Sequence, residues 1–169
     1  AIRVKLTPYK PKYDFYFNTH EDAELGHRSV TFYVEGDQES PIKISRGEER
    51  IFVWCLYLAL FEVEGWADSQ DAHFFIDDPV SSLDDHNIFV TAATLYDLIE
   101  SQYEKRKIII ATHHIGLFSI LSDWLTKGEK SSKYKPRTKL QVLKSKEGEL
   151  ILETPNNNVF LYHLQLLQT

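Results

Sequence analysis

Two short apolar runs, each followed at once by polar residues, most constrain how this chain can fold. The first, His73 to Ile76, ends in Asp77-Asp78-Pro79, and the second, Ile108 to Ile110, ends in Ala111-Thr112-His113-His114. Because proline cannot continue a central strand, the first run stops with its carboxylates at its carboxyl end. The stretch Asp84 to Glu104 between them has apolar residues at helical spacing, so the order strand, helix, strand predicts parallel pairing. Sites of parallel sheets lie at that carboxyl edge.

A helix start precedes these two strands. Ser45-Arg46-Gly47-Glu48 matches the Ser-x-x-Glu capping box, and an unbroken apolar stretch from Ile51 to Phe61 follows it. The free N–H groups and positive dipole of a helix start, beside a glycine that permits close approach, suit phosphate. Taken alone, however, the pattern favours a simple helix cap.

The remaining elements flank this central part. Alternation predicts strands at Tyr13 to Phe17 and Ser29 to Val34, which we expect to pair in a small antiparallel sheet. Further along we expect a helix at Leu117 to Leu125, a hairpin of Leu140 to Leu143 with Leu150 to Leu152 around Lys146-Glu147-Gly148, and a helix at Val159 to Leu167.

Composition excludes several classes of protein. The chain has 169 residues, of which 43% are hydrophobic, enough for one domain with a core. It has no apolar run long enough to span a bilayer and no export signal at its start. The chain has a single cysteine, Cys55, which excludes disulfides and cysteine zinc sites within the chain. Because Cys55 lies in the apolar run, we expect it to be buried.

Charge and the absence of methionine carry two further expectations. A net charge of −6 argues against general adhesion to nucleic acid. The basic residues late in the chain are interpreted as a solvated face; they are Lys127, Lys130, Lys133, Lys135, Arg137, Lys139, Lys144 and Lys146. Because there is no methionine, even at the start, we expect a fragment or processed piece of a longer protein.

The acidic pair and the histidine suit phosphoryl transfer. One carboxylate of the pair can hold Mg²⁺ through water, and the next can orient an attacking water. A histidine at the end of the neighbouring strand can hydrogen-bond a phosphate.

Three segments together resemble the SMC-like branch of the ABC ATPase superfamily. ISRGEER looks like the signature motif, HFFIDDPVSSLD like Walker B with the D-loop, and IIIATHH like the switch-histidine strand, in the family's order. The resemblance covers Val30 to Leu125, and its most specific piece, DDPVSSLD, is similar to bacterial anticodon nucleases and related phage-defence ATPases.

The resemblance implies a fold and a domain plan. The fold is α/β, a P-loop NTPase-like ABC ATPase C-terminal lobe with mainly parallel core strands, flanking helices and small antiparallel β elements. We expect one domain over 1–169: a β-rich entry at 1–43, the three motifs at 44–126, and a β-hairpin with a terminal helix at 127–169.

By the same resemblance, the two strand ends supply catalysis. Asp77 would hold the water shell of Mg²⁺, Asp78 would polarise the hydrolytic water, and His113 would contact the γ-phosphate. The family usually has Glu where this chain has Asp78, and the shorter side chain is expected to slow hydrolysis.

The other implied site residues act across a dimer. Those of the signature motif, which would contact the ATP of the opposite protomer, are Ser45, Arg46, Gly47 and Glu48; those of the D-loop are Ser82, Leu83 and Asp84. Among them, Arg46 stands where the family usually has a small residue, and Asp84 would communicate across the dimer.

The resemblance also implies partners, because the chain has no Gly-x-x-x-x-Gly-Lys-Ser/Thr and cannot grip a triphosphate alone. An N-terminal lobe with Walker A, on the same or a separate chain, would complete the site, and two heads would form a homodimer. ATP and Mg²⁺ are the implied cofactors, nucleic acid (DNA or tRNA) would be reached through other domains, and the location would be cytoplasmic, away from membranes. The chain by itself would be inactive.

Two alternatives remain open at this point. Asp77, Asp78, Asp84, His113 and His114 could be ligands of a catalytic metal in an ATP-independent phosphoesterase. The chain could also be a non-catalytic module for dimerisation or for nucleic-acid binding through its late lysines.

Overall fold

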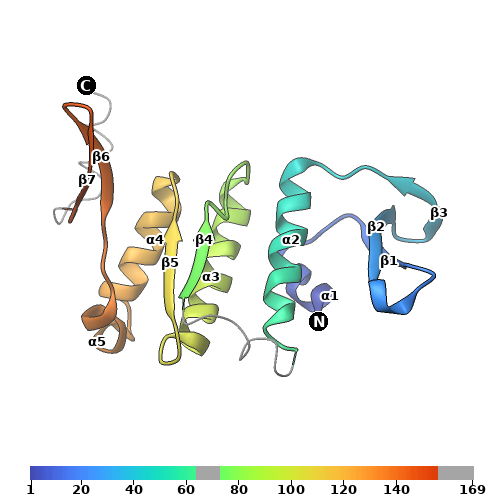
Figure 1. Cartoon of the computed structure of the whole chain (residues 1–169), viewed down its shortest axis with the longest axis horizontal. Helices are drawn as coiled ribbons and strands as arrows, with labels where there is room; N and C mark the ends of the chain where they lie inside the picture. The colour runs from blue at the N-terminus through green and yellow to red at the C-terminus, as the bar shows by residue number, and fades with distance from the viewer. Residues whose placement is uncertain (64–72, 156–169) are drawn as a thin grey trace.

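A computed structural model describes residues 1–63 and 73–155 of the chain (Figure 1). The helices are α1 (Ile2–Leu6), α2 (Arg46–Leu60), α3 (Asp85–Gln102), α4 (Ile115–Thr126) and α5 (Ser131–Tyr134), with 3-10 turns at Thr7–Tyr9, Ala23–Leu25 and Lys135–Arg137. The strands are β1 (Asp14–Thr19), β2 (His27–Val34), β3 (Asp37–Ile42), β4 (His73–Asp77), β5 (Lys107–Ala111), β6 (Val142–Lys146) and β7 (Glu149–Glu153). The helix predicted at Val159 to Leu167 lies outside the described residues. Within the described part, none of the helices has the length and apolar character needed to cross a bilayer.

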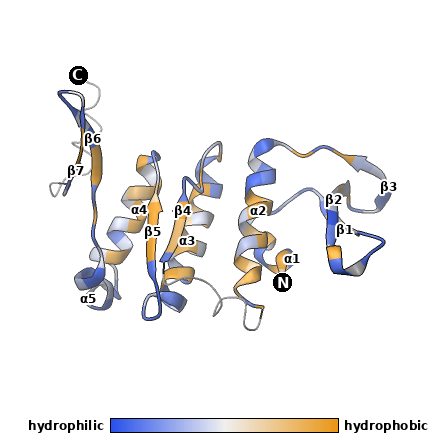
Figure 2. Ribbon diagram, in the orientation of Figure 1, coloured by the Kyte–Doolittle hydropathy of each residue, from blue (hydrophilic) through white to orange (hydrophobic). Residues whose placement is uncertain are grey.

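The parallel strand pair predicted from the two apolar runs is confirmed. β4 and β5 pair in parallel, with His73 opposite Lys107 and Asp77 opposite Ala111. Both strands are apolar over most of their length (Figure 2), and α3 and α4 lie on one side of them (Figure 1). The fold is therefore mixed α/β, with a parallel pair at its centre and small antiparallel sheets at its two ends.

Only one face of the parallel pair is covered within the described chain. Phe74 and Ile76 are buried, at 5% and 6% exposed; Ile76 lies in the main core cluster with residues of α3 and α4, and the Phe74 ring packs on Phe61 at the end of α2. On the opposite face, Phe75 is 70% exposed and Ile109, its partner in the register, is 41% exposed. Parallel sheets in proteins are normally covered on both faces, so this apolar face lacks its usual covering layer within the described residues.

The capping box predicted at the start of α2 is present. The Ser45 Oγ accepts a hydrogen bond from the Glu48 backbone N–H at 3.3 Å, and the Ser45 N–H donates to Glu48 Oε2 at 2.8 Å. The helix then buries one face, on which Cys55 is fully enclosed. Burial raises the pKa of the Cys55 thiol to about 12, as expected for a thiol that acts as a small apolar side chain.

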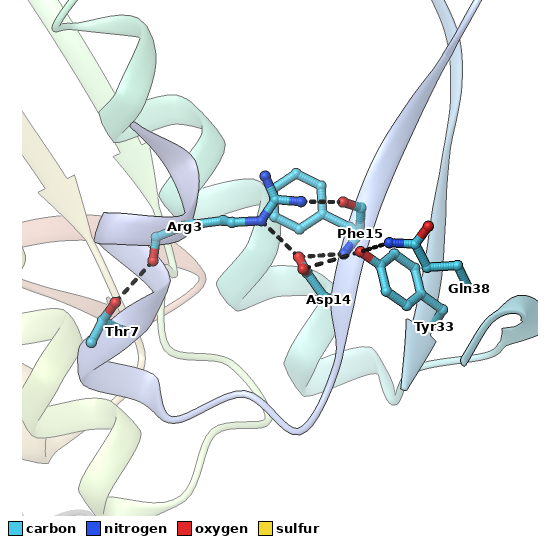
Figure 3. Close-up of polar contacts among 6 residues, drawn as sticks. All are labelled: Arg3, Thr7, Asp14, Phe15, Tyr33 and Gln38. Atoms are coloured by element: carbon cyan, nitrogen blue, oxygen red, sulfur yellow. Dashed lines mark hydrogen bonds and ion pairs between the residues drawn. The ribbon is translucent and has the colours of Figure 1, made fainter. Parts of the chain in front are cut away.

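An antiparallel sheet, β1–β2–β3, stands beside α2 at one end of the molecule (Figure 1). Arg3 of α1 links the helix to this sheet. The Arg3 Nε donates to Asp14 Oδ1 at 2.8 Å, and the Arg3 Nη2 donates to the Phe15 carbonyl at 2.7 Å (Figure 3). The Tyr33 hydroxyl donates to Asp14 Oδ2 at 3.1 Å. Burial acts to raise the pKa of the Asp14 carboxyl, but the hydrogen bonds from Arg3, the Phe15 N–H and Tyr33 outweigh it and lower that pKa.

Several local predictions needed correction. The chain opens with a helix, α1, which was not predicted because five residues are too few for a recognisable period; β1, β2 and β3 follow within residues 1–43. The strand β3 was missed because it contains Pro41, which an edge strand tolerates. The hairpin β6–β7 turns at Glu147-Gly148 as predicted, but its first strand starts two residues later, at Val142.

The late basic residues are only partly a solvated face. Three of them form ion pairs: Lys127 with Asp123, Lys130 with Glu100, and Lys144 with Glu153. Lys133 and Arg137 lie over the ring of Tyr103, at 4.5 Å and 5.3 Å from its centroid. The contacts of Lys130, Lys133 and Arg137 attach the α5 region to α3, while the other two ion pairs are local to the end of α4 and to the β6–β7 hairpin.

Candidate active site

The carboxyl edge of the parallel pair brings the predicted acidic and histidine residues together. Asp78 follows β4, and its N–H donates to the Ala111 carbonyl at 2.7 Å, which continues the strand pairing by one residue. Its carboxylate then meets the residues after β5: Thr112 Oγ1 lies 3.1 Å from Oδ1, and His113 Nδ1 lies 2.9 Å from Oδ2. Both oxygens of Asp78 are thus engaged by the neighbouring strand end.

The backbone at Asp78 explains why aspartate fits this position. Its φ is 44°, in the left-handed region that residues other than glycine rarely adopt. Asp and Asn enter this region more readily than other side chains, because their short polar groups bond locally. An unusual backbone conformation that the surrounding strands maintain is a frequent feature of functional sites.

The loop after β5 is anchored by the start of α4. His114 is the N-cap of α4, and its Nδ1 accepts a hydrogen bond from the Leu117 N–H at 3.3 Å. Leu117 is fully buried. Since His114 Nδ1 is an acceptor here, this imidazole serves the helix, whereas the neighbouring His113 is 74% exposed.

Asp77 points in a different direction from Asp78. It ends β4 on the face that carries Phe75 and Ile109, and it is exposed. A single exposed carboxylate at the edge of a parallel pair suits Mg²⁺, which keeps several waters and takes its remaining oxygens from phosphates. Asp77 is thus a residue that could hold the magnesium implied by the resemblance.

The start of α2 packs against the loop that leaves Asp78. A Cβ atom at Gly47 would lie 3.1 Å from the Ser82 carbonyl oxygen and 3.7 Å from Leu83 Cδ2. Arg50 Nη1, one turn further along, donates to the Ser81 carbonyl at 2.6 Å. The two predicted motifs, far apart in sequence, therefore form one continuous surface through a glycine contact and an arginine hydrogen bond.

The loop ends at Asp84, which is the N-cap of α3. Its Oδ1 accepts from the Asn87 N–H at 2.9 Å, and its Oδ2 accepts from Asn87 Nδ2 at 2.9 Å. Asp84 therefore caps the helix that was predicted between the two strands. Ser82, two residues earlier, is exposed with a φ of 67°.

The five-ligand metal centre of the phosphoesterase alternative is not assembled. Across residues 1–63 and 73–155, no group of three or more His, Cys, Asp or Glu side chains is arranged to hold a metal ion. The reason is local: Asp84 and His114 cap helices, while Asp78 accepts hydrogen bonds from Thr112 and His113.

Two residues of this region were absent from the predicted site. Thr112 was recognised only as part of the strand end, although a hydroxyl before a histidine at the same edge as an acidic pair was a usable signal. Arg50 had no signal, because its contact with Ser81 spans 31 positions of sequence.

Comparisons with known proteins identify the family of this chain. The family model described as AAA domain, AAA_13, matches residues 4–167. An anticodon nuclease of Escherichia coli is 31% identical over 156 residues, which are 83% of this chain and 38% of that protein. The chain thus spans well under half of that relative's length.

Two solved structures show the same fold. One, from work on ATP-driven dimerization and DNA-stimulated activation of SMC ATPases, aligns with a TM-score of 0.59 at 14% identity, over 98% of this chain and 88% of that one. The other, an SMC head bound to the C-winged helix domain of ScpA, aligns with a TM-score of 0.56 at 15% identity, over 95% and 42% respectively. The chain therefore belongs to the AAA_13 family of AAA domains, is related to an anticodon nuclease, and shares its fold with these two SMC structures.

Proposed function

We propose that this chain supplies the signature helix, the acidic pair and the switch histidine of an ATP-hydrolysing head. The observation that carries the proposal is the meeting of Asp78, Thr112 and His113 at the carboxyl edge of β4 and β5, next to the exposed Asp77. An acid, a hydrogen-bonding histidine and a magnesium-binding carboxylate on one edge are the groups that phosphoryl transfer to water requires.

The exposed apolar face of the parallel pair supports the presence of a second lobe that packs on it. Phe75 and Ile109 are exposed there, on the same face as Asp77. We propose that a lobe with the Walker A loop covers this face, whether it belongs to the same or another chain. That lobe would bring the triphosphate to the edge where Asp77 and Asp78 end, because phosphate loops also lie at the carboxyl ends of parallel strands.

In this arrangement the residues of this chain have separate tasks. Asp77 holds the water shell of Mg²⁺, whose charge neutralises the phosphate oxygens when it is bound. Asp78 orients the attacking water and accepts its proton. His113, which is exposed and lies beside Asp78, turns from Asp78 to the γ-phosphate.

The start of α2 serves the second protomer of a homodimer. Ser45 and Arg46 are exposed at the N-terminus of a 15-residue helix, where backbone N–H groups and the dipole favour an anion. Glu48 and Gly47 belong to the same turn, and Gly47 rests on Ser82 and Leu83. Closure of the dimer therefore reaches Asp78 through the loop that ends at Asp84.

The cellular role that we propose rests on the relationship to a nuclease. The related protein is an anticodon nuclease. We propose that residues 1–169 act as one unit within a larger cytoplasmic protein, and that ATP-dependent closure controls a nuclease acting on tRNA or another nucleic acid, in phage defence.

The test is ATP hydrolysis by the complete head, with Mg²⁺ and the Walker A lobe supplied. We expect phosphate release only when both halves are present, loss of turnover with a trapped dimer for Asp78→Asn, and loss of dimerisation for Ser45→Arg. Two matched variants serve as controls: Asp97→Asn on the exposed face of α3, and Ser132→Arg on α5.

Two outcomes contradict the proposal. Phosphate release by this chain alone places the whole site within it. Unchanged turnover for Asp78→Asn removes the assigned proton acceptor; metal-dependent phosphoester cleavage without ATP would then point to the alternative enzyme class.

A further inference from the structure

The hydroxyl of Thr112 has two partners, and their chemistry fixes the direction of each bond. The His114 backbone N–H donates to Thr112 Oγ1 at 3.0 Å, and Asp78 Oδ1 lies 3.1 Å from the same oxygen. A backbone N–H cannot accept, so it occupies a lone pair of the hydroxyl. The single hydrogen of the hydroxyl is thus directed to the Asp78 carboxylate.

The residues around Thr112 hold it in place. β5 ends one residue before it, and α4 begins three residues after it with the His114 cap on the Leu117 N–H. Leu117 is buried in the main core cluster. The half-buried Thr112 is therefore a fixed point between a paired strand and a packed helix.

The second partner of Asp78 is held much less firmly. His113 Nδ1 lies 2.9 Å from Oδ2, but the imidazole is 74% exposed, against 21% for the Asp78 side chain. Exposed ion pairs contribute little to stability, about 0–1 kcal/mol. The two carboxylate oxygens thus differ: Oδ1 is tied to a fixed hydroxyl, and Oδ2 faces a side chain that is free to turn away.

We infer that Thr112 is a positioning residue that fixes Asp78 Oδ1, so that Oδ2 is the oxygen that receives the proton of the attacking water. The inference deepens the proposed ATPase function and rests on it. In the step, a water O–H bond breaks, its proton goes to Oδ2, its oxygen bonds to the γ-phosphorus, and the ADP oxygen leaves with the bonding electron pair. Thr112 keeps its own proton throughout.

The physical reason is rotational freedom. Without the Thr112 hydroxyl, the Asp78 carboxylate loses the bond that holds Oδ1 and keeps its contact with the exposed His113. Errors of about 1 Å in the placement of a catalytic group can cost about a hundredfold in rate. Binding of ATP involves other residues, so the effect is expected on kcat and not on KM.

The experiment measures steady-state ATP hydrolysis by the complete head for Thr112→Val, Thr112→Ser and the wild type. We expect Thr112→Val to lower kcat about tenfold, as for loss of one hydrogen bond to a charged group, with KM for ATP within about twofold. Thr112→Ser, which keeps the hydroxyl, should restore most of kcat. Thr126→Val is the matched control, because the Thr126 hydroxyl donates within α4, to the Ser122 carbonyl.

Three results overturn the inference: equal kcat for Thr112→Val and wild type, equal loss in the Val and Ser variants, or an effect confined to KM. If Thr112→Val does not fold, as judged by circular dichroism, Thr112→Ala takes its place in the comparison. Asp78→Asn in the same assay distinguishes failure of the proposed function from failure of the role of Thr112. Full turnover in Asp78→Asn refutes the proposed function, whereas its loss beside an unaffected Thr112→Val refutes only the role of Thr112.

Discussion

The dual assignment of Asp84, as a helix cap and as a proposed D-loop residue, leads to a prediction that separates the two roles. In the structure both carboxylate oxygens of Asp84 accept hydrogen bonds from Asn87, at 2.9 Å each. The bond from the Asn87 N–H satisfies one of the N–H groups that the first turn of a helix leaves unpaired. Asp84→Ala removes both bonds, whereas Asp84→Asn keeps an acceptor oxygen and removes only the charge.

The magnitudes differ accordingly. Replacing an N-cap Asp by Ala costs about 1 kcal/mol, within a range of about 0.5–2. The lost bond to Asn87 Nδ2 is exposed and adds little. For a chain of this length, 1 kcal/mol lowers Tm by about 2–4 °C. Asn caps helices about as well as Asp, so Asp84→Asn should change stability by only a few tenths of a kcal/mol, through the helix dipole.

Urea denaturation followed by circular dichroism measures this difference, provided that the slope m is equal in the three proteins. The expected order of stability is wild type, then Asp84→Asn close behind, then Asp84→Ala. If Asp84→Ala is as stable as the wild type, or if the Asn variant falls as far as the Ala variant, the capping argument is wrong. If Asp84→Asn is stable but blocks ATP-dependent dimerisation, the carboxylate acts in the dimer as well.

Four further predictions concern other parts of the chain. Gly47→Ala should give less than the usual gain of about 1 kcal/mol for Gly to Ala in a helix, because the Cβ would press on the Ser82 carbonyl; urea denaturation with turnover checks this. Asp78→Glu should lower stability by about 1 kcal/mol, owing to the left-handed backbone, and should not raise turnover; the same pair of assays tests it. Burial raises the pKa of Cys55 to about 12, so this thiol should resist a thiol reagent at pH 8 until the protein unfolds. The stabilising contribution of the protonated thiol should fall as pH rises from about 9 towards 12, and Cys55→Ala should lack this trend. Asp14 has a lowered pKa, so its contribution to stability is complete above its ordinary pKa of 3.8 and is lost as pH falls through the lower folded value; Asp14→Asn should reduce this acid sensitivity in acid titrations.

Much of the central fold could be predicted from sequence because its signals are local and strong. Proline after the acidic pair stops β4, and the Ser45 and Glu48 side chains define the start of α2. The order strand, helix, strand leaves a parallel pair as the favoured arrangement. The helix α1 was missed because five residues show no clear period, and β3 was missed because it contains Pro41.

The site was predicted in its members but not in its contacts. Sequence reasoning placed Asp78 and His113 at one edge, and the structure adds that Thr112 and His113 hold opposite oxygens of one carboxylate. It separated the two histidines, since His114 caps α4. The structure also showed that Asp84 caps α3, and that the five residues of the alternative metal centre are not arranged to hold a metal ion.

The sequence by itself determined which residues end the two central strands and which begin the helices, because caps, proline and apolar periods act over a few residues. Only the tertiary structure decided how those ends meet. The left-handed backbone of Asp78, the approach of Gly47 to Ser82, and the exposed apolar face with Phe75 depend on residues far apart along the chain. Such contacts follow from the packing of whole elements, and no short stretch of sequence encodes them.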